Sequence, residues 1–344
     1  MLASGAWFVY RDDGKGRLRG TGPFVLADKS APEGGGPAPH LRFRFNEFCW
    51  SGRPYLDAVE VTLGVSPLKG LLDLQLGKTD WSELSVETAR RAQQSNLRFW
   101  ASSPLTLYAL RFVGDGKSER EKALREAVSL SLDRTAMAAV LLQRQAEPAP
   151  SFLPQWLSGY AFLFDMESNM ERAKESRTKF PSSMPGAGQP LRLGVEAGND
   201  LSKLLAERVA VNARAAGLSL QVVPKGGSRA GDKPEAELQL IAWRYTTLSQ
   251  RNALEALGAA WRLGLPEGGV PGEPDARYAL EKRMVEERIL VPLVVVPDFA
   301  AVDSRVRNWS PAPWGEWRMA DVWLEEEEAP AREAEAKSAA GAKP

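Results

Sequence analysis

A stretch near the middle of the chain, in which strand and helix alternate, constrains the fold more than any other feature. Leu191–Val195 is predicted to be a strand and Leu218–Val223 a second one, with apolar residues at helical spacing between them. The helix is expected to start at a capping Asp200 and to end at Gly217, where a left-handed cap fits. Leu238–Trp243 adds a third strand. Such units build open α/β sheets with ligand crevices at the carboxyl ends of their strands.

Strands dominate the first part of the chain. They are predicted at Phe24–Leu26, Leu41–Phe45, Ala58–Leu63, Leu97–Trp100 and Leu105–Phe112. Pro67–Leu76 is predicted to be a short helix with Leu68, Leu71, Leu72 and Leu76 on one side.

Helices follow this region. Ser118 and Glu121 form the pattern of a capping box, and Asp133 is expected to cap a second helix. A later helix, starting at about Pro274, leads into Ile289–Val296, the most apolar strand of the chain. These elements predict strand-rich ends around an α/β middle, and the length suggests about two domains. Residues 325–344 lack apolar periodicity and are predicted to be a disordered tail.

Composition excludes several classes of function. Acidic and basic residues balance at 44 each, and a neutral chain lacks the basic surface that nucleic-acid binding requires. Gly14–Gly16 lacks the spacing of a nucleotide-binding loop and is predicted to be a surface turn. No apolar run is long enough to span a membrane, and Met1–Tyr10 lacks the features of a signal peptide. We therefore expect no nucleic acid, no cofactor and no membrane insertion.

One histidine and one cysteine leave little room for catalysis. His40 lies in a Gly/Pro-rich stretch that is predicted to be an exposed loop, and Cys49, between Phe48 and Trp50, is predicted to be a buried apolar residue. A single Cys excludes an internal disulfide and a multi-Cys metal site. Triad and Cys–His chemistry would both depend on the same histidine. We predict no catalytic residue, no metal site and no enzymatic activity.

Six segments, in order along the chain, resemble the family 5 extracellular solute-binding proteins of peptide and nickel importers. The most specific are Asn46–Val59, which is similar to the family's N-x-x-Y-W-x-G-x-P-x-L-D-x-V segment, and Leu124–Arg134, which resembles its V-R-Q-A helix ending in I-D-R. The other four are Gly20–Leu26, Leu76–Asp80, Ala216–Leu218 and Val291–Leu293. Each segment alone is weak, but the ordered set is specific.

The resemblance implies a periplasmic-binding-protein-like α/β fold of type II, whose two lobes close on a ligand. It implies that residues 1–112 with 291–324 form a strand-rich first lobe and that 113–290 form an α/β second lobe. It implies an incomplete first lobe, because family members carry a long segment before the turn that here begins at Gly20. The implied function is the substrate-binding component of an ABC importer, which captures a peptide-like or other small solute and delivers it to a permease. A monomer in the periplasm or outside the cell is expected.

Predicted ligand contacts come from two regions: the stretch that begins at Trp243, and a proline-flanked segment carrying Trp156 and Tyr160 that is predicted to be a loop. Peptide binders of the family have an Asp shortly after a Trp-bearing strand, where it pairs with the ligand's amine, but Trp243–Ser249 contains no acid. Arg244 and Arg251 instead offer guanidinium groups suited to a carboxylate or a phosphate, unless both are simple surface residues. Aromatic residues often line ligand crevices, although most pack in cores. The predicted contacts are Trp243, Arg244, Tyr245, Arg251, Trp156 and Tyr160.

Other interpretations stay open. The chain could be a cytoplasmic ligand-sensing or regulatory module, because domains of this family also occur as effector domains of regulators. It could also be a truncated lobe that binds nothing. An enzyme is the weakest alternative, since only carboxylates and lysines remain for chemistry.

Overall fold

The structure, a computed structural model, describes residues 10–12, 18–30, 39–95, 97–114, 118–161, 164–165, 167–179, 189–225 and 236–325. The chain forms two compact units, one made of Met1–Ala101 with Phe299–Pro344 and the other of Ser102–Asp298. It passes from one unit to the other inside two strands, β7 (Arg98–Phe112) and β12 (Leu290–Val302). The sequence placed the lobe limits at residues 112 and 291. These positions lie at the end of β7 and the start of β12, whereas the two units divide near the start of β7 and within the second half of β12.

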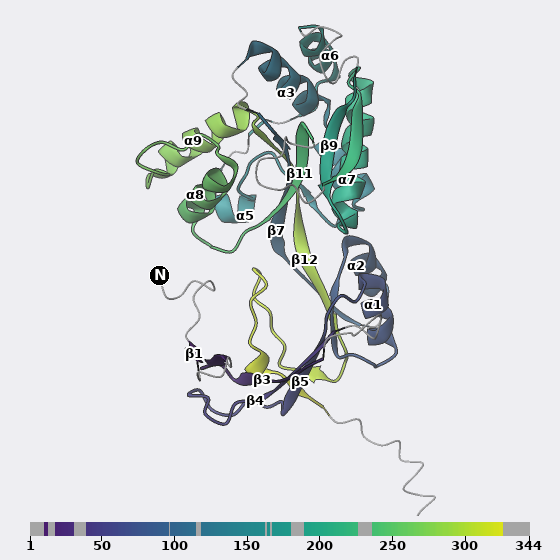
Figure 1. The fold of residues 1–344 in the computed structure, drawn as a ribbon, viewed down its shortest axis with the longest axis vertical. Helices are drawn as coiled ribbons and strands as arrows, with labels where there is room; N and C mark the ends of the chain where they lie inside the picture. The colour runs from purple at the N-terminus through teal and green to yellow at the C-terminus, as the bar shows by residue number, and fades with distance from the viewer. Residues whose placement is uncertain are drawn as a thin grey trace, which may run out of the picture. The chain divides into compact units, whose positions relative to one another are not determined.

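The second unit is built on a mixed sheet with helices on both faces (Figure 1). Its strands follow the order β10-β9-β11-β7-β12, and a short strand β8 pairs with β12. Strands β9, β10 and β11 are parallel, and β7 runs antiparallel to β11. The bounds are β8 (Glu147–Pro148), β9 (Leu191–Glu196), β10 (Leu220–Lys225) and β11 (Leu238–Arg244). The predicted strand–helix–strand unit is confirmed.

The helices of this unit are α3 (Glu119–Ser131), α4 (Arg134–Ala136), α5 (Gln155–Ser158), α6 (Met170–Thr178), α7 (Asp200–Ala215), α8 (Gln250–Trp261) and α9 (Pro274–Glu286), with a π-helical turn η1 (Met137–Leu141) after α4. Helices α5, α8 and α9 share one core with Leu107, Ala109 and Ile241 of the sheet. Helix α7 packs on β9, β10 and β11 and also contacts α3. Alternate strand residues therefore face different helices.

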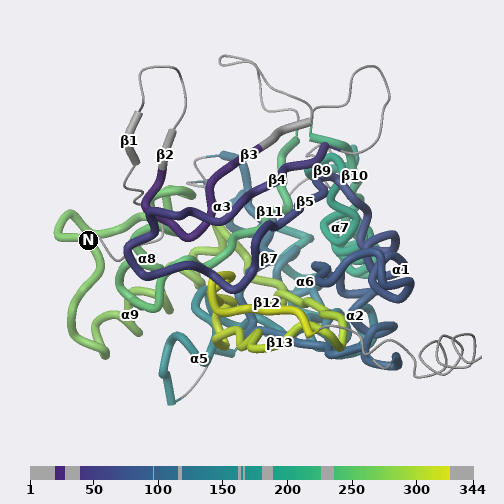
Figure 2. The backbone as a smooth tube through the Cα atoms, turned by 90° about the horizontal axis from the view of Figure 1, so that it is seen from below, coloured from purple at the N-terminus to yellow at the C-terminus, as the bar shows by residue number. Residues whose placement is uncertain are grey.

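The first unit contains a three-stranded antiparallel sheet, β3-β4-β5, whose strands lie side by side in Figures 1 and 2. Three of its tryptophans pack together: Trp309 makes edge-to-face contacts with Trp100 and Trp317. The elements are β1 (Tyr10–Asp12), β2 (Leu18–Gly20), β3 (Phe24–Ser30), β4 (His40–Phe45), β5 (Ala58–Thr62), α1 (Pro67–Gln75), β6 (Trp81–Leu84), α2 (Val86–Gln93), β13 (Val306–Arg307), the 3-10 turn η2 (Met319–Asp321) and β14 (Trp323–Leu324).

Strand β7 corrects the prediction of two separate strands, because it runs unbroken from Arg98 to Phe112. The small residues in its middle resemble a turn in the sequence. In the structure the hydroxyl of Ser102 accepts a hydrogen bond from the backbone N–H of Asp298 on β12, at 2.8 Å. The strand therefore stays attached to its neighbour where its own sequence is least strand-like.

Two helix boundaries also differ from prediction. Helix α7 is capped by Asn199 and not by Asp200, since the Asn199 side chain accepts from the backbone N–H of Ser202 at 2.9 Å. Trp156 lies in the short helix α5, where a loop was expected. The predicted capping box of α3 is confirmed, because the Ser118 and Glu121 side chains each accept from the other's backbone N–H.

Three surface predictions need correction. His40 is exposed as expected, but it starts strand β4 instead of lying in a loop. Cys49 is only half-buried, and its neighbours Phe48 and Trp50 are almost fully exposed, so this segment is not core. On α1 the buried residues are Gly70, Leu71 and Leu74, while Leu68, Leu72 and Leu76 are exposed.

Helices α2, α6 and α8 and strand β6 were not predicted. The buried faces of α2 and α6 consist of Ala, Thr and Ser side chains, which leave no large apolar periodicity to detect. The predicted turn at Gly14–Gly16 and the predicted tail after Glu325 lie outside the described residues. No helix in the described part of the chain is both long and apolar enough to cross a membrane.

Candidate functional site

The carboxyl end of the second unit's sheet is the candidate site. Because β9, β10 and β11 are parallel, they all end there, at Glu196, Lys225 and Arg244. The part of β12 that belongs to this unit ends at the same edge of the sheet. At this edge the N–H of Asp298 donates to Ser102 of β7, and at the opposite edge the N–H of Phe112 donates to the carbonyl of Ile289. Ligands of open α/β sheets bind at such carboxyl ends.

An exposed ion pair stands at this end of the sheet. The Nε and Nη2 atoms of Arg244 both donate to Oδ2 of Asp298, at 3.2 and 2.5 Å. The two side chains keep 47% and 30% of their surface exposed. Both charges are therefore within reach of a dissolved molecule. Asp298 is held in place through its own backbone N–H, which donates to the buried hydroxyl of Ser102.

A buried phenol lies behind this pair. Burial raises the pKa of Tyr108, a hydrogen bond with Asn199 acts in the opposite direction, and the charge of Asp298 adds to the rise. Tyr108 is consequently a neutral hydrogen-bonding group at physiological pH. We call Ser102, Tyr108, Asn199, Arg244 and Asp298 the carboxyl-end cluster.

The structure separates Arg244 from the aromatic residues that were predicted to share its site. Adjacent strand residues point to opposite faces of a sheet. Trp243 lies opposite Leu107, which belongs to the core with α5, α8 and α9, whereas Arg244 lies opposite Thr106. Arg244 and Trp243 are thus at the same end of the sheet but on different faces.

The four predicted aromatic contacts come together with the core beneath α5, α8 and α9. Tyr245 is only 4% exposed, and its hydroxyl donates to the backbone carbonyl of Phe152. The indole N–H of Trp156 donates to the carbonyl of Pro104 at 2.7 Å. Trp243 and Tyr160 are half-buried, and each makes an edge-to-face contact with another aromatic ring. Each of the four therefore has a packing role.

A buried carboxyl group underlies this aromatic cluster. Glu281 of α9 is 0% exposed, and its Oε1 accepts from the backbone N–H of Leu153 at 2.8 Å. Burial raises its pKa to about 7, and the hydrogen bond from the Leu153 N–H acts in the opposite direction. The Tyr160 hydroxyl is close enough to influence the carboxyl, although its geometry falls short of a well-formed hydrogen bond.

Arg251 lies apart from the carboxyl-end cluster, on the exposed side of α8. Its Nε pairs with Glu255 one turn later, at 3.0 Å. Glu255 also accepts from the backbone N–H of Val270, at 3.3 Å. Arg251 therefore links its helix to the following loop.

Sequence reasoning missed Asp298 and Tyr108. One signal was available: Asp298 is the single charge in β12, the most apolar strand of the chain. A carboxylate inside such a strand is costly unless it has a partner. Its partner, Arg244, is 54 residues away, so sequence spacing could not show the pairing. Among the described residues, no group of three or more His, Cys, Asp or Glu side chains is arranged to hold a metal ion.

Comparison with known proteins identifies this architecture. The family model for bacterial extracellular solute-binding proteins, family 5 (middle region), matches residues 9–261. No curated protein gives a significant sequence match. NikA from Brucella suis, solved in complex with Fe(III)-EDTA, is 19% identical with a TM-score of 0.71, covering 89% of this chain and 68% of NikA.

Two peptide-binding structures are similar to the same extent. The oligopeptide-binding protein AppA from Bacillus subtilis, in complex with a nonapeptide, is 16% identical with a TM-score of 0.68, covering 91% of this chain and 68% of AppA. DppA from Helicobacter pylori, in complex with the peptide STSA, is 16% identical with a TM-score of 0.68, covering 89% and 63%. At identities this low, the structural similarity shows a shared fold. The shared fold confirms the predicted α/β architecture of solute-binding proteins.

Proposed function

Because the chain belongs to family 5 of the bacterial extracellular solute-binding proteins, we propose that it captures a small solute or a peptide without covalent chemistry. We further propose that it delivers this solute to the permease of an ABC importer and acts as a monomer, in the periplasm or outside the cell. NikA and AppA, whose structures hold Fe(III)-EDTA and a nonapeptide, support a solute-binding role.

The Arg244–Asp298 pair is the observation that carries the proposal. Two opposite charges remain exposed at the end of the sheet where α/β proteins bind ligands, beside a neutral phenol. A guanidinium forms paired hydrogen bonds with a carboxylate or a phosphate, so we propose Arg244 as the group that receives an anionic part of the solute.

The other predicted contacts differ in how much of each side chain is exposed. Trp243, Trp156 and Arg251 keep exposed atoms and stay proposed ligand contacts. Tyr160 is half-buried like Trp243 and also stays a proposed contact, whereas Tyr245 is almost fully buried and would act by supporting the chain around Arg244. Contact by any of them is testable by substitution.

A thermal-shift screen of the full chain tests the function. The panel contains peptides, amino acids, sugars, carboxylates and metal ions. A ligand that binds only the folded protein stabilises it by about 2.7 kcal/mol at 100 times its Kd, which is a shift of a few degrees for a chain of this size. We expect one class to give such a shift and substrate turnover to be absent.

Two matched variants then test the site. Arg244→Gln should weaken binding of that ligand about tenfold or more, because a charge-assisted contact is lost. Arg192→Gln is the control, since Arg192 forms a similar exposed pair with Glu237 at the other end of the same sheet. Equal binding by wild type and Arg244→Gln would reject the site. A cooperative melt that no ligand shifts would reject the function and favour a lobe that binds nothing.

A further inference from the structure

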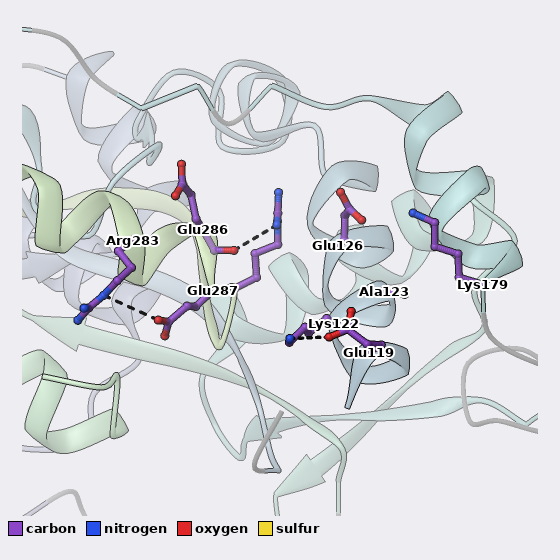
Figure 3. A pocket seen from close by; sticks show the side chains of 9 residues that line it. Glu119, Lys122, Ala123, Glu126, Lys179, Arg283, Glu286 and Glu287 are labelled. Carbon is purple, nitrogen blue, oxygen red and sulfur yellow. Dashed lines mark hydrogen bonds and ion pairs between the residues drawn. The ribbon is translucent and has the colours of Figure 1, made fainter. Parts of the chain in front are cut away.

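A cavity of about 440 Å³ lies in the second unit, at the opposite end of the sheet from the carboxyl-end cluster (Figure 3). Side chains from α3, from the end of α6 and from the end of α9 line it. Helix α3 follows the last residue of β7, and α9 precedes the first residue of β12, which places the cavity there. The described lining residues include four carboxylates and four cations.

The carboxylates of the cavity all lie close to positive charges. Each one has a cationic partner within 4.0 Å: Glu119 pairs with Lys122, Glu126 with Arg172, Glu286 with Lys282 and Glu287 with Arg283. Glu126 is the most fully engaged, because its second oxygen also accepts from the hydroxyl of Ser176, at 2.9 Å. These acids consequently leave little negative charge to attract a cation into the cavity.

Two cations of the lining are left without such a partner. Neither Lys179 nor Arg288 forms an ion pair with a carboxylate of the described residues. Arg288 donates only to a backbone carbonyl, that of Glu286, at 3.2 Å. Figure 3 shows Lys179 reaching from the end of α6 into the same space as Glu126. The uncompensated charge of the cavity is therefore positive.

The backbone at Arg288 is unusual for an arginine. Its φ is +52°, in the left-handed region that glycine normally occupies after a helix. An arginine here has a less favourable backbone than glycine would have. Its side chain also lines a second cavity of about 200 Å³, whose charged lining residues are Asp165, Glu167 and Arg172. Arg288 thus lines both cavities.

More positive charge is buried behind Arg288. Arg125 and Arg134 are 6% and 5% exposed. Burial, followed by the charge of Arg288, lowers the pKa of Arg134 to about 10. Burial also lowers the pKa of Arg125, with Glu121 and Glu287 acting against it and Arg288 acting with it. Arg288 is therefore close enough to repel each of the two buried guanidinium groups, and a bound anion would relieve this repulsion.

We propose that this cavity is a binding site for a small multivalent oxyanion, phosphate or carboxylate, held by Lys179 and Arg288. The site is separate from the carboxyl-end cluster and does not depend on the proposed transport function. Arg288 supplies the planar donor fork and Lys179 a compact second charge. The cavity is large enough for a small molecule that carries such a group.

Calorimetry and thermal shift on the full chain test the site. The probes are inorganic phosphate, pyrophosphate and citrate, each compared with sodium chloride at equal ionic strength. We expect a saturable rise in Tm that chloride does not give, and the tighter of the phosphate and citrate arms identifies the source of the oxyanion. Arg288→Gly should keep the fold, because glycine favours this φ, and should lose at least tenfold in affinity.

Three further variants make the test specific. Lys179→Gln should weaken binding severalfold, whereas Lys122→Gln, which removes a paired cation of the same cavity, should stay within about twofold of wild type. Arg192→Gln, which removes an exposed cation paired with Glu237 outside both sites, should bind the probe like wild type. The proposal is overturned if no probe binds saturably, if Arg288→Gly and Lys179→Gln bind as wild type does, or if Lys122→Gln or Arg192→Gln loses as much as they do.

Discussion

Two charged residues, Asp298 and Glu281, follow or interrupt apolar sequence and are held by partners that the fold brings to them. Asp298 interrupts an apolar strand and pairs with Arg244, and Glu281 is enclosed in the core beneath α5, α8 and α9. In both cases the backbone is part of the arrangement: Asp298 is anchored by its own N–H, and Glu281 accepts from that of Leu153. Such groups affect stability through their protonation as well as through their contacts.

Glu281 should make the stability of the protein depend on pH. Its pKa is about 7 in the folded chain and 4.5 when exposed, so the folded state holds a proton that the unfolded state releases. The contribution is complete below pH 4.5, falls as the pH rises, and is lost above about pH 7. At full size, this contribution of Glu281 to the free energy of unfolding is of the order of 3 kcal/mol. Urea denaturation between pH 4.5 and 8 should show this decline.

Glu281→Gln should remove most of that slope while keeping an acceptor for Leu153. Glu267→Gln, at an exposed position, is the matched control and should keep the slope. An unchanged pH dependence in Glu281→Gln would show that other groups cause it.

At the scale of elements, capping residues in the sequence predict where a helix begins, but not always which residue is the cap. The capping box of α3 is visible in the sequence, because both of its partners lie within four residues. Asn199 and Asp200 are both good caps, and sequence favours neither. The structure selects Asn199, whose side chain also hydrogen-bonds with Tyr108 of the sheet.

Because Asn199 is the cap, substitutions of Asn199 and Asp200 should lower the free energy of unfolding by different amounts. Asn199→Ala should destabilise the protein by about 1 kcal/mol, because the N–H of Ser202 loses its acceptor. Asp200→Ala should cost only about 0.3–1 kcal/mol, since only a favourable charge at the first turn of α7 is lost. Urea denaturation measures both, and a larger loss for Asp200→Ala would contradict the assignment of the cap.

Helix α1 shows why apolar periodicity can mislead. Leucines occupy more than one face of this short helix, so the pattern does not say which face is buried. Leu74 is 1% exposed and Leu72 is 48% exposed. We expect Leu74→Ala to lower the free energy of unfolding by about 2–5 kcal/mol and Leu72→Ala by less than about 1 kcal/mol. Similar losses for both would mean that Leu72 is covered in solution.

At the scale of the whole molecule, the two units differ in how they are encoded. The second unit is one continuous segment, Ser102–Asp298, whereas the first is assembled from two segments far apart in sequence. The second unit also carries a complete core of its own, formed by α5, α8 and α9 against the sheet.

A fragment spanning Ser102–Asp298 should therefore fold by itself. We expect a cooperative thermal transition by circular dichroism. Leu254→Ala, which opens a hole in the core of this unit, should lower the Tm of the fragment and of the full chain alike. A fragment without a cooperative transition would show that this core needs the rest of the chain.

The sequence by itself determined the family, the strand–helix–strand unit at Leu191–Val223 and the capping box at Ser118. These depend on residues that are close in the chain, and their signals survive without knowledge of the fold. Most errors arose where a residue's environment comes from distant partners: the continuity of β7 through Ser102, the buried face of α1 and the position of Cys49.

Only the tertiary structure decided the make-up of the candidate site. Alternation along β11 put Arg244 and Trp243 on opposite faces, and folding brought Asp298 to Arg244 across 54 residues. Lys179 and Arg288, which form no ion pair within the described part of the chain, likewise share a cavity only because α6 and α9 end beside α3. Hydrogen bonds and ion pairs act over a few ångströms in space, and distance along the chain does not report them.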